Sequence, residues 1–178
     1  KKVILVDHNS YEQSAIGLEE ADIIEIIDHH NISNLGTTHP INFRNMPVGS
    51  TNTIIYTLYK EHNAQIDKDI AGIMASGIIS DTLLLKSPTT TPLDKAWNEL
   101  SVIAGIDYET FGLKMFKNGS IFSGKTKEEI FFQDFKSFDI DDKKVGVSQV
   151  LTTDFDSFLN QKNEYINLIE EIAFDKNY

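Results

Sequence analysis

The chain has 178 residues, of which 40% are hydrophobic and 24% are charged, a composition typical of folded soluble proteins. Its formal net charge of −11 disfavours long nucleic acids as partners, although bound metal ions can reverse the charge locally. The absence of cysteine excludes disulfides, iron–sulfur clusters and thiolate zinc sites, so any metal must use oxygen and imidazole ligands. No apolar run reaches the ~18 residues of a membrane helix and no signal peptide is visible, so we expect a cytoplasmic protein without a membrane partner.

Two short apolar runs near the start of the chain are each followed by polar residues. Residues 3–6 predict a buried strand of a parallel sheet that ends at Asp7. Residues 23–27 predict a second strand, which ends at Asp-His-His, residues 28–30. About twenty residues separate the two strand ends, which is enough for a crossover between parallel strands. A short helix is expected within residues 11–20, and the fold class is therefore α/β.

The middle of the chain is expected to be mainly helical. Ser50 or Thr51 can cap one helix, and Asp67 can cap the next. Thr91-Pro92-Leu93-Asp94 resembles a capping signal with proline at the first helical position, which is another sign of a helix start. The expected helices occupy about 51–62, 67–81 and 92–105, a further helix follows Asp107, and residues 87–91 form a loop.

Residues 117–120 interrupt the helical pattern and mark the expected domain boundary. The capping box at residues 126–129 then predicts a helix to about Phe135, and residues 145–151 predict a strand. A final helix is expected to start at Asp156. A strand–helix unit without further partner strands indicates a domain that is cut short, so we expect the chain to be a fragment.

The polar residues at the two strand ends are candidates for a common site. In open parallel sheets, ligands bind beyond the carboxyl ends of the strands. Asp7 and residues 28–30 should therefore share one crevice. Each group could instead be an ordinary turn at a strand end, but the occurrence of both favours a shared site.

Asp81 ends an apolar helix stripe and should lie where an unpaired charge is costly. The residues of the same stripe are Ile70, Met74 and Gly77. Burying an unpaired carboxylate costs several kcal/mol, on the order of the stability margin of a small domain. Lys86 or solvent at the helix end could compensate it, and the alternative is a divalent cation shared with Asp7 and His29. Such a sulfur-free ligand set suits manganese, or magnesium less well, and leaves zinc open.

Five motifs lie in register along the chain. They are Val-Ile-Leu-Val-Asp-His-Asn at 3–9, Ile-Asp-His-His at 27–30, Pro-Val-Gly at 47–49, Ile-Ile-Ser-Asp at 78–81 and Leu-Lys-Ser-Pro-Thr at 85–89. In order and spacing they resemble the motifs of family II (manganese-dependent) inorganic pyrophosphatases, which belong to the Asp-His-His (DHH) phosphoesterase superfamily. The resemblance continues through residues 112–136 and covers nearly the whole chain.

The resemblance implies a domain organisation and an activity. Residues 1–117 would form a parallel-sheet DHH domain lacking its N-terminal part, and residues 118–178 a truncated α/β domain of the DHHA2 type. The implied reaction is hydrolysis of inorganic pyrophosphate to two phosphates by a metal-activated water at a two-metal site. The implied cofactor is Mn²⁺, with Mg²⁺ or Co²⁺ as substitutes.

The resemblance also assigns roles to individual residues. Asp7 would bridge two manganese ions as a catalytic metal ligand. His29 and Asp81 would complete most of the shell of one ion. His30 would be catalytic and bind the substrate phosphate, and Lys136 would bind pyrophosphate from the second domain. Without the resemblance, Lys136 reads equally well as a solvated surface lysine.

Other residues near these motifs carry weaker expectations. Residues 49–51 start a helix and could hold a phosphate through free backbone N–H groups, although such a helix start is more often a simple cap. His8 is expected to tune Asp7 from outside the metal shell. His39 and His62 match no motif and are expected to be exposed.

The chain also departs from the family pattern. Nothing before Asp7 corresponds to the family's N-terminal His-x-x-x-Asp-x-Asp motif, and the C-terminal Arg-Lys segment that binds substrate is absent. Ser10 replaces the usual glutamate, which leaves the role of that position open. We therefore expect these residues alone to bind metal weakly and to hydrolyse pyrophosphate poorly or not at all. Homodimers, and a nucleotide-binding regulatory module inserted before the strand that ends at Asp7, are further features of the family.

Two alternative functions stay open. One is another DHH phosphoesterase acting on short oligonucleotides or polyphosphate, which the charge of −11 and the lack of a glycine-rich nucleic-acid motif oppose. The other is a non-catalytic module that keeps the fold. The joint presence of Asp7, His29 and Asp81 argues against the non-catalytic module.

Overall fold

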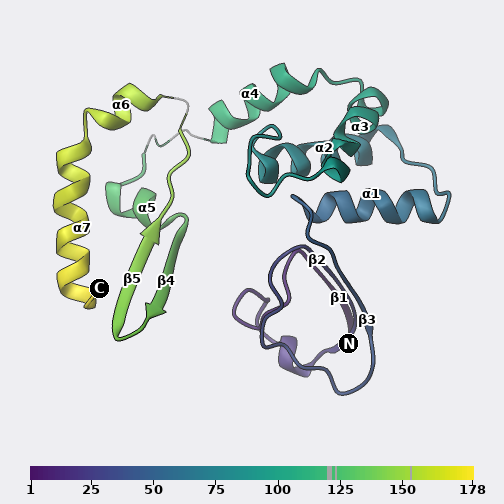
Figure 1. Ribbon diagram of the computed structural model, residues 1–178, viewed down its shortest axis with the longest axis horizontal. Coiled ribbons are helices and arrows are strands. Elements are labelled where there is room, and N and C mark those ends of the chain that lie inside the picture. The colour runs from purple at the N-terminus through teal and green to yellow at the C-terminus, as the bar shows by residue number, and fades with distance from the viewer. Residues whose placement is uncertain (120–121, 123, 153) are drawn as a thin grey trace. The chain divides into compact units, whose positions relative to one another are not determined.

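A computed structural model describes residues 1–119, 122, 124–152 and 154–178 (Figure 1). The chain forms two compact units, Lys1–Gly112 and Leu113–Tyr178. Helix α4, Tyr108–Gly119, contains the division between them and also residue 117, where the sequence placed the domain boundary. That sequence-based boundary stays a prediction.

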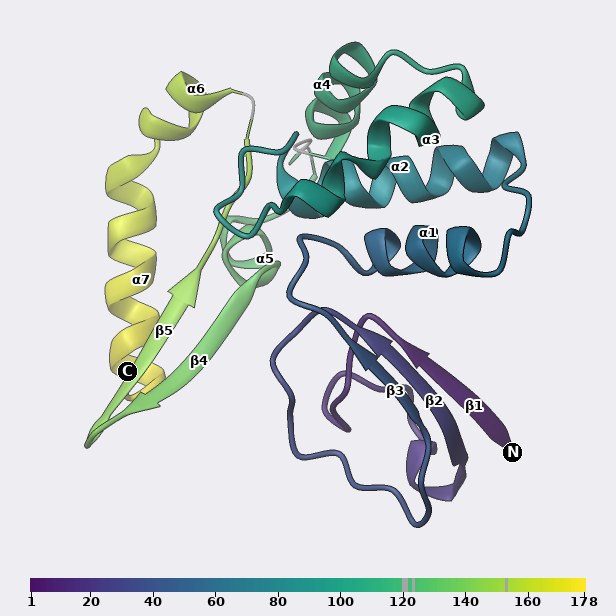
Figure 2. The same cartoon turned by 45° about the vertical axis from the view of Figure 1, so that its right-hand side comes forward.

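A three-stranded parallel sheet forms the first part of the first unit, which confirms the α/β class. Its strands lie in the order β1 (Lys2–Val6), β2 (Asp22–Asp28) and β3 (Asn42–Asn45), and Figure 2 shows them side by side and pointing the same way. Val6 pairs with Ile27, and the backbone N–H of Asp7 donates to the Ile27 carbonyl over 3.0 Å. The polar residues that follow β1 and β2 therefore lie at the same edge of the sheet.

The two faces of the sheet are buried by different clusters. Leu5, Leu18, Ile23 and Ile26 form one cluster, and Ile27 packs with Val48 and Ile54 in another. Of the short helix expected within residues 11–20, the structure has only a three-residue 3₁₀ helix, η1, at Leu18–Glu20, preceded by turns. The Ser10 and Ser14 side chains hydrogen-bond to nearby backbone groups in this segment, and such bonds compete with helix formation.

Helices complete the first unit. Helix α1, Thr51–Glu61, is capped by Ser50, whose hydroxyl accepts from the backbone N–H of Asn52. Helix α2, Lys68–Thr82, is capped by Asp67, as the sequence predicted. The helix expected over 92–105 begins as a 3₁₀ turn, η2, at Pro92–Ala96 and continues as α3, Trp97–Ala104. Buried side chains of α2 and α3 form the main core of the unit: Ala71, Met74, Ala75, Ile78, Leu100 and Ala104.

The second unit packs helices against a two-stranded antiparallel sheet. Its elements are α5 (Lys127–Phe132), β4 (Phe135–Ile140), β5 (Lys143–Ser148), α6 (Phe155–Leu159) and α7 (Lys162–Lys176). The helix expected to reach Phe135 ends at Phe132, because Phe135 starts the strand that pairs with β5. The single helix expected from Asp156 is two helices, and Asp154 caps the first of them. Within the described ranges, no helix has the length and apolar character needed to cross a membrane.

Candidate metal centre

Asp7 lies directly beyond the end of β1, and its backbone is left-handed with φ 67°. Aspartate adopts this conformation more readily than most residues because its short polar side chain can hydrogen-bond locally. The Asp7 side chain is 57% exposed. Its Oδ1 accepts a hydrogen bond from Thr51 Oγ1 over 2.7 Å, so the start of α1 orients a carboxylate that keeps access to solvent.

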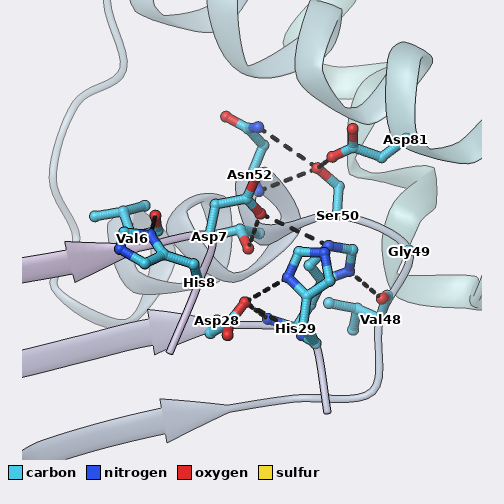
Figure 3. A network of polar contacts seen from close by, with 12 residues as sticks. Val6, Asp7, His8, Asp28, His29, Val48, Gly49, Ser50, Asn52 and Asp81 are labelled. Atoms are coloured by element: carbon cyan, nitrogen blue, oxygen red, sulfur yellow. Dashed lines mark hydrogen bonds and ion pairs between the residues drawn. The ribbon is translucent and has the colours of Figure 1, made fainter. Parts of the chain in front are cut away.

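His29 follows the end of β2 and is held in one tautomer. Its Nδ1 lies 2.9 Å from the carbonyl oxygen of Val48. A carbonyl can only accept, so Nδ1 carries the hydrogen and Nε2 keeps its lone pair. Nε2 lies 3.6 Å from Asp7 Oδ1 (Figure 3). A histidine whose second nitrogen donates to a carbonyl is the usual arrangement of a metal ligand.

His30 is oriented in the same way by a carboxylate. Its Nδ1 donates to Asp28 Oδ1 over 2.8 Å, and its ring is 49% exposed. The rings of His29 and His30 have centroids 4.2 Å apart. One ligand atom each from Asp7, His29 and His30 lie within 4.8 Å of one another, close enough to surround a single cation.

Asp28 is fully buried and anchors both histidines. Its carboxylate accepts from Asn9 Nδ2, from His30 Nδ1 and from the backbone N–H groups of His29 and His30. Burial by itself raises the pKa of Asp28, but the hydrogen bonds from Asn9 and the histidines together lower the pKa below its usual value. Asp28 is therefore a buried carboxylate stabilised by hydrogen-bond donors, and it fixes the ring of His30.

Asp81 lies one residue before the end of α2 and faces the same region (Figure 3). Its Oδ2 accepts from Ser50 Oγ over 2.5 Å. Desolvation raises the pKa of Asp81, the negative charge of Asp7 raises it further, and the Ser50 hydrogen bond acts in the opposite direction. Nearby protein atoms partly desolvate the carboxylate, but the residue is exposed to solvent. The expectation from the sequence that Asp81 would be buried is therefore wrong. The described residues give it no ion pair with Lys86, the partner that would have made Asp81 a purely structural group.

One short segment, Val48–Thr51, contacts all three expected metal ligands. Val48 accepts from His29, Ser50 donates to Asp81, and Thr51 donates to Asp7. The side chain of Ser50 is therefore a helix cap and also part of the site. A role of residues 49–51 in phosphate binding stays a prediction.

Two other expectations concern residues outside this cluster. His8 does not hydrogen-bond to Asp7, because its ring contacts the Val6 carbonyl and Ser14 Oγ instead, each at 3.0 Å. Lys136 is exposed on β4, opposite Val147 of β5, in the second unit. Its role in substrate binding stays a prediction.

Sequence reasoning placed Asp28 in the site without assigning it a role, and it missed Asn9 and Asp94 as members of the polar network. Asn9 and Asp28 fall inside motifs that the sequence showed, but a pattern of residues gives no sign that Asn9 bridges to Asp28. Asp94 was visible only as a capping residue, whereas its carboxylate also binds the backbone N–H of Gly49.

Comparison with known proteins agrees with this geometry. Residues 1–78 match the DHH family, N-terminal domain, and residues 113–178 match the DHHA2 domain. The chain is 47% identical over 176 residues to the manganese-dependent inorganic pyrophosphatase of Bacillus subtilis, which covers 98% of this chain and 57% of the relative. It is 49% identical over 174 residues to the cobalt-dependent inorganic pyrophosphatase of Clostridium perfringens, covering 97% of this chain and 32% of the relative.

A solved structure shows the same likeness in three dimensions. A Methanococcus jannaschii protein described as a family II inorganic pyrophosphatase aligns with a TM-score of 0.80 and 43% identity, over 100% of this chain and 62% of that one. The chain thus spans between about a third and three fifths of the length of these proteins. It consists of a DHH domain followed by a DHHA2 domain, and along nearly its whole length it is similar to the family II inorganic pyrophosphatases.

Proposed function

We propose that this protein binds divalent manganese through Asp7, His29 and Asp81 and hydrolyses inorganic pyrophosphate to two phosphates. The observation that carries the proposal is that one segment, Val48–Thr51, hydrogen-bonds to all three of these residues. Beside it, ligand atoms of Asp7, His29 and His30 lie within 4.8 Å of one another, a set that does not include Asp81. The names of the relatives, which are manganese- and cobalt-dependent pyrophosphatases, support the substrate and the metal.

The donor groups fit a divalent cation of intermediate hardness. His29 presents the lone pair of Nε2, because its Nδ1–H is held by Val48, and Asp7 presents an exposed carboxylate. Asp81 is a carboxylate whose negative charge is disfavoured by burial and by Asp7, and a cation relieves both effects. Imidazole and carboxylate donors without sulfur suit Mn²⁺ or Co²⁺ and leave Mg²⁺ a weaker substitute.

The remaining side chains have roles toward the substrate. A divalent cation, when bound, lowers the pKa of a coordinated water toward neutrality and offsets phosphate charge. Asp28 fixes the ring of His30 through Nδ1, so Nε2 is the nitrogen that would bind a phosphate oxygen. Lys136 supplies positive charge to the pyrophosphate from the second unit, as the family resemblance implies.

The test combines metal binding with phosphate release. Mn²⁺ binding is measured by titration calorimetry on the wild type, Asp7→Asn and Asp69→Asn, and phosphate release from pyrophosphate is measured on the same samples. Asp69 is a matched control because it is an exposed aspartate in the first turn of α2. We expect Asp7→Asn alone to lose binding and activity. Since the chain spans at most about three fifths of the length of these relatives, the expected wild-type signals are weak Mn²⁺ binding and slow phosphate release. Complete absence of Mn²⁺ binding in the wild type would favour a non-catalytic module, and faster hydrolysis of a dinucleotide than of pyrophosphate would favour an oligonucleotide phosphoesterase.

A further inference from the structure

The carboxylate of Asp94 is completely buried in η2 and receives hydrogen bonds from three separate segments. Gly49 N–H donates to both oxygens at 3.1 and 3.0 Å, and Thr53 Oγ1 donates to Oδ1 over 2.6 Å. Thr91 donates to Oδ2 through its backbone N–H over 2.6 Å and through its hydroxyl over 2.8 Å. Among the described residues no lysine or arginine forms an ion pair with it, so neutral donors alone compensate the buried charge.

Gly49 is the point at which Asp94 acts on the Val48–Thr51 segment. A Cβ at residue 49 would lie 2.7 Å from Thr82 Cγ2 and 2.9 Å from Asp94 Oδ2, both closer than real Cβ contacts. The Gly49 backbone is therefore confined between Asp94 and Thr82, and Thr82 directly follows the candidate ligand Asp81. The other residues of the segment hydrogen-bond to the candidate ligands, as Figure 3 shows for Ser50 and Asp81.

We propose that Asp94 is a positioning residue for the metal centre, which sets the distance between Asp7 and Asp81 without touching metal or substrate. It fixes the Gly49 backbone and, through Thr53, the first turn of α1, and these two anchors determine where Ser50 and Thr51 place their hydroxyls. The inference rests on the proposed metal-binding function of the same site.

The chemistry requires a carboxylate at this position. Its two oxygens serve five donor contacts, whereas an asparagine has one acceptor oxygen and an NH₂ group that would face the N–H of Gly49 or Thr91. Asp94→Asn keeps the volume of the side chain but leaves donors without a partner, so the backbone around Gly49 must shift.

The experiment compares Asp94→Asn with Asp67→Asn, the same change at an exposed helix cap that does not contact the segment and whose hydrogen bonds an amide oxygen can still accept. Circular dichroism first establishes that each variant is folded. We then measure Mn²⁺ affinity by calorimetry, the Co²⁺ absorption spectrum, and the His29 ring tautomer by nitrogen NMR without metal. We expect Asp94→Asn to lose about 10- to 100-fold in affinity, as for other residues that orient metal ligands, and to alter the spectrum. Asp67→Asn should change neither the Mn²⁺ affinity nor the Co²⁺ spectrum.

A gentler variant covers the case in which Asp94→Asn does not fold. Thr53→Val removes a single hydrogen bond to Oδ1, and it should lower Mn²⁺ affinity several-fold with the same change in the Co²⁺ spectrum. Unchanged affinity and spectrum in the folded Asp94 or Thr53 variant, or an equal loss in Asp67→Asn, would overturn the positioning role. If the wild type binds no metal, the proposed metal-binding function is wrong, but the positioning role of Asp94 is not yet decided. The positioning role is then decided by the His29 tautomer, which should be fixed in the wild type and mixed in the Asp94 or Thr53 variant.

Discussion

Ser50 Oγ donates a hydrogen bond to Asp81 Oδ2 over 2.5 Å, and the same hydroxyl caps α1. One side chain thus joins the start of one helix to the end of another at the candidate metal centre. Burial and the charge of Asp7 raise the pKa of Asp81, whereas the Ser50 hydrogen bond lowers it. The net direction is upward, so the charge of Asp81 is less favourable here than in a free aspartate.

Asp81→Asn should therefore separate stability from metal binding. The amide oxygen can still accept from Ser50, and the unfavourable charge is removed, so the metal-free variant should melt at the wild-type temperature or above it. The gain should be below about 1 kcal/mol, because the side chain keeps solvent access. Addition of Mn²⁺ should raise the melting temperature of the wild type but not that of the variant. A metal-free variant that melts well below the wild type would show that Asp81 is structural.

The tautomer of His29 leads to a second prediction. Its Nδ1–H is held by Val48, so the free Nε2 should be the metal-binding atom. His29→Gln removes that nitrogen, and we expect Mn²⁺ affinity to fall by at least ~100-fold, since even residues that only orient ligands contribute 10- to 100-fold. His39→Gln is the control, because His39 forms a surface ion pair with Asp22. Equal affinity in the two variants would exclude His29 from the metal shell.

The sequence was sufficient for the parts of the fold that depend on local patterns. Apolar runs ending in acidic residues predicted β1 and β2, and Asp67 predicted the start of α2, because strands, caps and helix stripes leave signals in neighbouring residues. The approach of Asp7 to His29 also followed, since parallel strands bring their carboxyl ends to one edge.

Features that depend on tertiary contacts could not be predicted. Strand β3 is short and polar, and it is held by backbone pairing with β2 rather than by an apolar pattern. Residues 83–85 are three leucines with left-handed backbones, which local preference disfavours by roughly 1–2 kcal/mol each. Hydrogen bonds to Thr82 and Ile79 hold this segment in place. Asp94 gave a capping signal only, because nothing in the sequence links it to a glycine 45 residues earlier.

The confinement of Gly49 gives a third prediction. An alanine there would meet Thr82 and Asp94 at less than 3.0 Å, so the backbone or its neighbours must move. Gly49→Ala should lower the free energy of unfolding by about 1–3 kcal/mol in urea denaturation, as overpacked sites do. Gly36→Ala is the matched control, because nothing lies within 4 Å of its Cβ position. Equal stability of the two variants would contradict the packing around Gly49.

The ion pair between Arg44 of β3 and Glu61 of α1 predicts a dependence on pH. Both guanidinium nitrogens donate to Glu61 at 2.6 Å, and these hydrogen bonds lower the pKa of Glu61 below its ordinary value of 4.5. A carboxyl with a lowered folded-state pKa stabilises the fold above its ordinary pKa, and this contribution is lost as the pH falls through the lowered value.

The melting temperatures of wild type and Glu61→Gln should therefore differ at neutral pH and converge in acid. Glu12→Gln serves as control, because Glu12 has no ion pair in the described part of the chain. A difference between wild type and Glu61→Gln that stays constant across the range would mean that the pair contributes nothing through its charge.

The buried carboxylate of Asp28 gives the last prediction. All of its partners are donors, and Asp28→Asn would turn an NH₂ group toward Asn9 or toward the ring of His30. The unfolding free energy should fall by about 1–3 kcal/mol for each donor left unpaired. His30 should lose its fixed tautomer, since no other residue in the described part of the chain binds Nδ1, whereas His29 should keep its own because Val48 still accepts from it. Nitrogen NMR of the two rings measures both effects in one sample, and a His30 ring that stays in a single tautomer would show that Asp28 does not orient it.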